Sequence, residues 1–475
     1  MIIVSGHAGK NVSMLARCWQ SLCALTVSIL IFSGATAEES PRLLGAATCG
    51  TATCHAAPEP WANSAVSQNE FNVWRDRDPH SDAWQTLTSA KSRDIARLMG
   101  IADPTVSEQC LDCHATRVGP GGAEPNFDIQ DGVSCEGCHG PASSWLGVHT
   151  SGLYFYNQNL QKGLYPTADP QKRAELCVSC HVGSPDNFIT HQMMAAGHPL
   201  MDFQLGFHTL FQEEADGQYS TYAHFTIDDD YLQRKPRPFG LKALLISEIV
   251  EWKQQLVLVN SHYTTPVGAF PELAFFDCYS CHFEINSLRL SGAVRGSPGY
   301  SNENALPFLI EQNFVLFDLA AEGLIDPDTH NSLKRYRSQL REAVSVSPAA
   351  VMGITDAMIE QLDSALVSLQ SRSLSGQDER AMLRRIEAAI SGRQVRDYMS
   401  ARHMLYAVAS IIDSLYQSGD VTEIEYNTAR ASLSRALSVK DRDVRNSLHQ
   451  QQAITTAISS VAESGSQPLQ GQEVP

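Results

Sequence analysis

Residues 132–149 have the sequence GVSCEGCHGPASSWLGVH, and this stretch decides how the N-terminal half of the chain is organised. Cys135 and Cys138 are separated by two residues, and His139 follows directly. This spacing is the pattern that attaches c-type haem to protein. Each cysteine sulfur forms a thioether with one haem vinyl group, and the turn between the cysteines presents the next histidine to the iron. The stretch therefore predicts a covalently bound haem with His139 as its proximal ligand.

The same pattern recurs along the chain and accounts for every cysteine after residue 37. The chain has 12 cysteines, of which Cys18 and Cys23 precede that point. The other ten form five pairs, each with a histidine directly after it: Cys49/Cys54 with His55, Cys110/Cys113 with His114, Cys135/Cys138 with His139, Cys177/Cys180 with His181, and Cys278/Cys281 with His282. Four of the pairs are CxxCH, whereas the first is widened to CxxxxCH.

Two other uses of paired cysteines leave these histidines unexplained. A disulfide framework needs no histidine after each second cysteine, and zinc ribbons pair one CxxC with another without needing that histidine. Covalent haem explains all the pairs together. We therefore expect five covalently attached haem c groups, with the widened first motif as the site that departs most from the usual spacing.

The first 37 residues have the features of a secretory signal peptide. Arg17 precedes an apolar run from Leu22 to Phe32, and Ala35-Thr36-Ala37 offers a small-residue cleavage site. About a dozen apolar residues are too few to span a bilayer, although an uncleaved N-terminal anchor is the alternative. No later run approaches the ~20 apolar residues of a transmembrane helix. We therefore expect a periplasmic protein that is soluble once residues 1–37 are removed.

The chain is acidic, which bears on its partners. Its 475 residues carry a formal net charge of −17. Removal of the signal peptide takes away Lys10 and Arg17 but no acid, which leaves 33 basic and 52 acidic residues and a charge of −19. An acidic surface disfavours nucleic acid and suits a basic redox partner. We expect an electron donor and an electron acceptor protein as partners, and no nucleic acid.

The character of the sequence changes at about residue 300. Residues 38–300 are rich in glycine, proline and turn residues, as expected where loops wrap cofactors, with helices predicted at 81–98 and 239–259. Residues 301–463 contain no cysteine and consist of amphipathic runs. The predicted fold class is mainly α: a loop-rich multihaem cytochrome c domain around five haems, then an α-helical bundle. Residues 464–475 are predicted to be a disordered tail.

Helix boundaries and apolar stripes in residues 301–463 predict five to seven helices. Asp326-Pro327 is typical of a helix start. Breaks are expected at Ser347-Pro348, Ser375-Gly376, Gly392 and Ser418-Gly419. Apolar residues recur at helical spacing in two sets: Met382, Ile386 and Ile390, and Leu405, Val408, Ile412 and Leu415. The bundle is expected to serve for docking or oligomerisation, or to be a plain stabilising extension.

The ligand at the sixth position of each iron separates a carrier from a catalyst. A second histidine gives low-spin iron that cycles electrons with little rearrangement, whereas an open position admits a small substrate. The candidate distal ligands are His80, His149, His198 and His191, followed by His208, His224 and His262. Met193 and Met194 fit apolar packing better than ligation. His330, His403 and His449 are expected on the surface or on helix faces.

The span from about Cys49 to His198 resembles the multihaem cytochrome c-554 family. The shared features are a first haem motif followed by a tryptophan and His80, CLDCH with a glycine-rich segment, GVSCEGCHGP with His149 downstream, and CVSCH. The resemblance implies that His149 binds the iron on His55 and that His80 binds the iron on His139. It also implies an open position on the second haem, at His114. For His181 it implies a distal partner among three residues: His191, His198 and His208.

The chain departs from that family in the widened first motif, in the fifth motif PELAFFDCYSCHFEI and in the C-terminal helical region. Pentahaem nitrite reductases, another five-haem class, use CxxCK at their catalytic haem, and no CxxCK occurs here. The leading hypothesis is a periplasmic pentahaem cytochrome c that relays electrons between redox partners, a carrier rather than an enzyme. The competing hypothesis is an oxidoreductase that acts on a small nitrogen or sulfur species at an open haem.

Overall fold

The protein is described by a computed structural model that covers most of the chain after residue 39. The described residues are 40–61, 64, 66–151, 156–199, 201, 204, 206, 211–213, 219–221, 229–263, 272–276, 312–344, 347–392, 395, 398–437 and 444–462. Several predicted features lie outside them: the signal peptide, the fifth motif with Cys278, Cys281 and His282, the tail at 464–475, His208, His224 and the domain boundary near residue 300.

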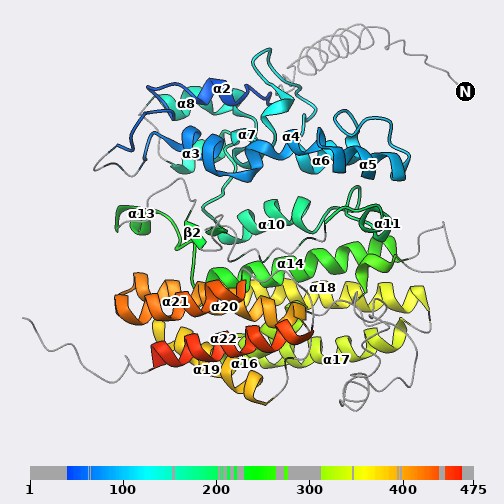
Figure 1. The fold of residues 1–475 in the computed structure, drawn as a ribbon, viewed down its shortest axis with the longest axis vertical. Helices are drawn as coiled ribbons and strands as arrows, with labels where there is room; N and C mark the ends of the chain where they lie inside the picture. The colour runs from blue at the N-terminus through cyan, green and yellow to red at the C-terminus, as the bar shows by residue number, and fades with distance from the viewer. Residues whose placement is uncertain are drawn as a thin grey trace, which may run out of the picture. The chain divides into compact units, whose positions relative to one another are not determined.

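From Arg42 onward the chain forms one compact unit that is mainly helical (Figure 1). The regular strands among the described residues are β1 (Phe211–Glu213) and β2 (Tyr219–Thr221), which pair antiparallel. The predicted mainly α fold class is therefore confirmed. No helix within the described ranges is long and apolar enough to cross a membrane.

The N-terminal part consists of short helices. They are α2 (Ala46–Cys49), α3 (Glu70–Arg77), η1 (Pro79–Asp82), α4 (Ala83–Leu87), α5 (Ala90–Met99), α6 (Glu108–His114), η2 (Ile129–Asp131), α7 (Cys135–His139), η3 (Ala142–Ser144), α8 (Leu146–Thr150), α9 (Tyr156–Gln161), α10 (Pro170–His181) and α11 (His191–Ala195). The helix predicted at 81–98 is divided between α4 and α5, because the Ser89 hydroxyl accepts the Ser92 N–H and starts a new helix.

Three of the haem motifs are the last turns of helices. Helices α6, α7 and α10 each end at the motif histidine, so both cysteines and the histidine project from one helical turn. The widened first motif is different, because α2 ends at Cys49 and a turn follows before His55. The two extra residues of CxxxxCH are therefore accommodated outside the helix.

The C-terminal part consists of longer helices. They are α13 (Asp229–Arg234), α14 (Leu241–His262), η4 (Leu273–Phe275), α16 (Gln312–Leu324, kinked at Glu322 and Gly323), α17 (Pro327–Ala343), α18 (Pro348–Gln370), α19 (Gly376–Ser391), α20 (Tyr398–Gln417), α21 (Glu423–Leu437) and α22 (Val444–Ala462). The helix starts predicted at Pro327, Pro348 and Gly376 are confirmed, as is the break at Ser418. Helices α16–α22, the seven described after residue 302, match the upper end of the predicted number.

Helix α14 lies between α10 and the other bundle helices and contacts α10, α16, α18 and α20 (Figure 1). It is buried on most of its circumference, which explains why apolar residues surround it rather than form one stripe. The prediction of a helix at 239–259 is thus confirmed. The predicted stripes on α19 and α20 are also buried in the same apolar core.

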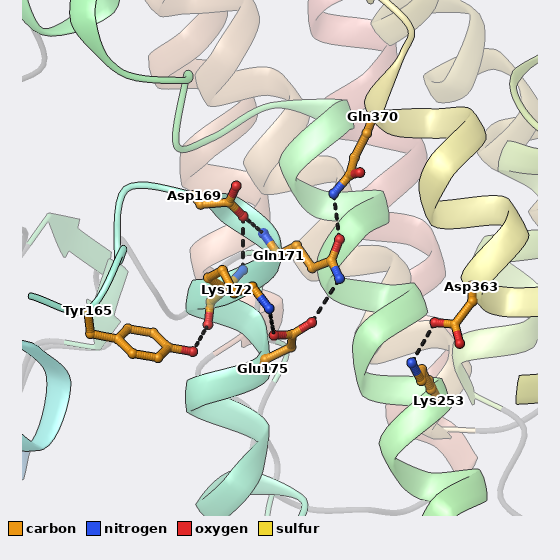
Figure 2. A network of polar contacts seen from close by, with 8 residues as sticks. All are labelled: Tyr165, Asp169, Gln171, Lys172, Glu175, Lys253, Asp363 and Gln370. Atoms are coloured by element: carbon orange, nitrogen blue, oxygen red, sulfur yellow. Dashed lines mark hydrogen bonds and ion pairs between the residues drawn. The ribbon is translucent and has the colours of Figure 1, made fainter. Parts of the chain in front are cut away.

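Helix α10 connects the fourth haem motif to the bundle. Ala174 and Val178 of α10 belong to the bundle's apolar core, and Cys177 packs against it. Figure 2 shows the polar side of the same junction, where the Gln370 amide of α18 donates to Gln171 at 2.5 Å and Gln171 donates to Glu175 at 2.8 Å. The helix that carries this motif is therefore held by side chains far along the chain.

The junction yields a stability prediction for α14. Leu244 is fully buried, and Leu244→Ala should lower the free energy of unfolding by about 2–5 kcal/mol because it leaves a cavity in the shared core. Val367 of α18 is 68% exposed, so Val367→Ala should change stability by less than about 0.5 kcal/mol. Denaturant titration followed by far-UV circular dichroism measures both, and equal losses would contradict the assigned core.

Candidate functional site

The stretch 132–149 holds its neighbours through its own backbone. Gly132 has φ +65°, and a Cβ there would lie 2.5 Å from the carbonyl oxygen of His80. The N–H of Val133 donates to that same oxygen at 3.0 Å. The Trp74 indole N–H donates to the Val133 carbonyl, also at 3.0 Å. Glycine at position 132 therefore allows the chain to approach His80 closely enough to fix its backbone.

Glu136, between the two cysteines of the third motif, is buried and serves as a backbone clamp. Its carboxylate accepts the N–H groups of Leu44, Gly45 and Ala142 at 2.7–2.9 Å. Charge-assisted hydrogen bonds of this kind are stronger than neutral ones and compensate for burial of the charge. This role was not predicted from the sequence, where a carboxylate between two motif cysteines is the available signal.

Six histidines meet as three pairs. The ring centroids of His55 and His149 are 6.0 Å apart, with planes 16° from parallel. Those of His80 and His181 are 5.9 Å apart at 89°, and those of His114 and His198 are 6.5 Å apart at 80°. Among the described residues, no cluster of three or more His, Cys, Asp or Glu side chains could hold a metal ion. The six histidines therefore form pairs rather than a larger cluster.

These separations fit two axial ligands of one iron. A metal ion binds an imidazole nitrogen at about 2.0 Å, and the ring centre lies about 1.1 Å behind that nitrogen, so two rings on opposite sides of an ion are about 6.2 Å apart. All three pairs lie within 0.3 Å of this value. The histidine pairs are therefore spaced as haem c would require.

The Nδ1 atoms of four paired histidines are already bound to protein acceptors. The acceptors are Glu70 for His55 at 2.8 Å, Asp78 for His80 at 2.9 Å, the Ala83 carbonyl for His114 at 2.9 Å and the Pro199 carbonyl for His198 at 2.9 Å. A histidine that ligates a metal usually donates its other ring N–H in this way, which fixes the tautomer and the ring orientation. In each case Nε2 is the nitrogen left to face an iron.

The contact between His55 and Glu70 shifts the pKa values of both groups. The hydrogen bond that His55 donates to Glu70 raises the pKa of His55. Burial acts to raise the pKa of Glu70, but hydrogen bonds, first among them that from His55, outweigh it and lower the value. Glu70 is therefore a carboxylate at neutral pH and keeps its charge beside the His55 ring.

His149 is positioned by the helical turn that precedes it. Its N–H donates to the Trp145 carbonyl at 2.8 Å, and the two rings lie edge to face with centroids 5.7 Å apart. Burial, followed by the neighbouring His55, lowers the pKa of His149. A neutral imidazole with a free nitrogen lone pair is the form that binds iron.

The eight described attachment cysteines are free thiols. The thiols of Cys49 and Cys135 interact, as do those of Cys113 and Cys180, so the first motif adjoins the third and the second adjoins the fourth. Burial raises the pKa of Cys138 to about 12 and that of Cys177 to about 11. Neutral, buried sulfurs suit a thioether, which carries no charge.

The structure differs in places from the expected ligand pairing. The resemblance pairs His80 with the iron on His139, whereas the His80 ring lies against His181. It leaves His114 open, whereas the His198 ring lies at ligand spacing from it. The ligand role of His191 stays a prediction, and its backbone N–H donates to Glu272.

The structure also shows the surroundings of two further histidines, His262 and His403. His262 donates from Nε2 to the Pro185 carbonyl at 2.6 Å. The expectation of a surface or helix-face position for His403 is wrong as regards exposure, because its side chain is fully buried with Nδ1 3.7 Å from Glu248. The polar partner on α14 makes burial of this histidine possible, and only the packed bundle reveals it.

Helical turns that end in CxxCH, with histidines paired at axial spacing, define a c-type cytochrome. Residues 48–140 match the family described as cytochrome c554 and c-prime. Cytochrome c-554 of Nitrosomonas europaea is 27% identical over 137 residues, which cover 26% of this chain and 57% of that protein. The N-terminal region of the chain is thus similar to the cytochrome c-554 family, and the matched segment spans little more than half the length of that relative. No solved structure matches it.

Gly132 provides a test of the close approach to His80. Gly132→Ala should destabilise the protein by clearly more than Gly100→Ala, measured as the free energy of unfolding. Gly100 (φ +73°, ψ +17°) is in the left-handed helical region, where another residue costs about 1–2 kcal/mol, and a Cβ there meets nothing within 4 Å. Gly132 (φ +65°, ψ −138°) lies near the extended positive-φ region that only glycine readily adopts, so its replacement costs more in backbone strain as well. Only Gly132→Ala adds a clash with the His80 carbonyl. Equal losses would show that the contact is unimportant.

Proposed function

We propose that this protein is a periplasmic pentahaem c-type cytochrome that carries electrons between a donor and an acceptor protein. The observation that supports it best is the spacing of His114 and His198, with ring centroids 6.5 Å apart. The iron on His114 is the one that the family resemblance leaves open. With histidine on both sides it has no free position for a small substrate, which favours a carrier over an enzyme.

The proposal assigns each residue a role in holding haem. The thioether cysteines are Cys49, Cys54, Cys110, Cys113, Cys135, Cys138, Cys177, Cys180, Cys278 and Cys281, and the proximal ligands are His55, His114, His139, His181 and His282. His149, His198 and His80 are the distal ligands for the irons on His55, His114 and His181. Bound haem supplies one-electron chemistry between Fe(III) and Fe(II), and the paired rings keep its coordination unchanged in both states.

Location and partners follow from the sequence features. Haem attachment outside the cytoplasm agrees with the predicted signal peptide at residues 1–37. The acidic chain, with 52 acidic and 35 basic residues, favours a basic redox partner through complementary charge. The bundle supports the fourth motif through α10. Measurement of the protein's mass in solution tests whether the bundle also serves for oligomerisation.

The proposal predicts the haem content and the spin state of the purified protein. Intact mass should show five haem additions, and the pyridine haemochrome assay should give the same number. Electron paramagnetic resonance of the oxidised protein should show the haems of the three histidine pairs as low spin. Less than about half a haem per chain would end the cytochrome assignment, and four additions would exclude the widened first motif.

His198 offers the sharpest test of the carrier assignment. His198→Ala should convert one haem from low spin to high spin while the number of attached haems stays the same, because the proximal ligand and the thioethers remain. His449→Ala is the matched control, since His449 is exposed on α22, is not among the candidate ligands and should leave every spin state unchanged. A high-spin signal already present in the wild type and unaffected by His198→Ala would favour a catalytic haem.

A further inference from the structure

We infer that Glu70 and Asp78 set a potential difference between the haems: they hold the irons of the His55–His149 and His80–His181 pairs at lower reduction potentials than the iron of the His114–His198 pair. The inference rests on the proposed function, because it requires haem at these pairs. It adds a role for two carboxylates that neither bind iron nor attach haem.

Glu70 is hydrogen-bonded to one ring of the His55–His149 pair. Its Oε2 accepts the Nδ1–H of His55 at 2.8 Å, and the two side chains are 16% and 27% exposed. Its Oε1 accepts the N–H of Gln68 at 3.1 Å. Gln68 has φ +61°, the one non-glycine residue with positive φ among those described. Such a conformation costs free energy, so the local backbone is strained at the point where it holds the carboxylate.

Asp78 performs the same task for His80 with a single oxygen. Its Oδ1 accepts both the backbone N–H of His80 at 3.0 Å and the ring Nδ1–H at 2.9 Å. Its side chain is 14% exposed. The carboxylate therefore starts η1 and orients the ring that the helix presents.

The His114–His198 pair has neutral acceptors instead. His114 donates to the Ala83 carbonyl and His198 to the Pro199 carbonyl, both at 2.9 Å. The positive charge of Lys91 also acts on the His198 ring. This pair thus has the geometry of the other two without a carboxylate bound to either imidazole.

The difference in charge changes which oxidation state is favoured. A carboxylate draws the Nδ1 proton toward itself, which makes Nε2 a more basic ligand. A more basic ligand and a nearby negative charge both stabilise Fe(III) over Fe(II), and the charge is little screened because the Glu70 and Asp78 side chains are only 16% and 14% exposed. With haem bound, transfer of an electron from the first or fourth haem to the iron on His114 would be downhill, the donor being oxidised as the acceptor is reduced.

Replacement of Glu70 by glutamine tests the inference, since the side chain keeps its shape and loses its charge. Glu70→Gln should raise the potential of the first haem so that its Fe(II)/Fe(III) ratio at a fixed potential increases about tenfold, or about 59 mV for one electron. The measurement is a redox titration followed by electron paramagnetic resonance. The rings of this pair are near parallel and those of the other two are near perpendicular, which gives the first haem a distinct low-spin signal.

Asp76→Asn is the matched control. Asp76 lies on the same helix, α3, and its exposed carboxylate pairs with Arg75 rather than with a histidine. Asp76→Asn should leave the reduction potentials unchanged. If it shifts the potential of the first haem as much as Glu70→Gln does, the effect comes from the net charge of the protein and not from the hydrogen bond to His55. Asp78→Asn should raise the reduction potential of the fourth haem in the same way. It provides a second test of the inference if Glu70→Gln does not fold. A low-spin, fully haem-loaded Glu70→Gln protein with unchanged potentials overturns the inference alone, whereas absence of haem overturns the proposed function.

Discussion

The close approach of Gly132 to the carbonyl of His80 is the contact on which the N-terminal half depends. Val133 donates to the same oxygen, and three residues later Glu136 binds the backbone of Leu44 and Gly45. One short stretch thereby joins a haem motif, the backbone of a histidine ligand candidate and the first described residues. Few apolar side chains in this half are buried, so specific polar contacts and the haems themselves must supply what an apolar core supplies elsewhere.

The C-terminal bundle is stabilised in a different way, by apolar packing between helices. Its long helices bury a continuous apolar core, and α10 takes part in that core with Ala174 and Val178 while it carries the fourth haem motif at its C-terminal end. A binding site on a rigid helix is held more precisely than one on a loop. Packing therefore couples the C-terminal bundle to α10. A change that destabilises the bundle should also disturb the position of His181 beside His80.

In the proposed cytochrome, coordination and potential would be controlled by different residues. The pairing of rings at about 6 Å determines whether an iron has a free position. The acceptor on Nδ1 determines how basic each ring is, and it is a carboxylate in two pairs and a carbonyl in the third. Because these acceptors lie outside the haem motifs, chains with the same motifs can differ in the order of their potentials.

The sequence by itself determined whatever depends on neighbouring residues: the attachment motifs, the helix start at Asp326-Pro327, the buried stripes of α19 and α20, and the mainly α class. The tertiary structure decided what depends on residues far apart in the chain. It placed His198 beside His114 and His80 beside His181, supplied Glu70 to His55, and buried His403 against Glu248. A CxxCH turn is complete within five residues, whereas a distal ligand is chosen by the packing of separate helices, which no local pattern encodes.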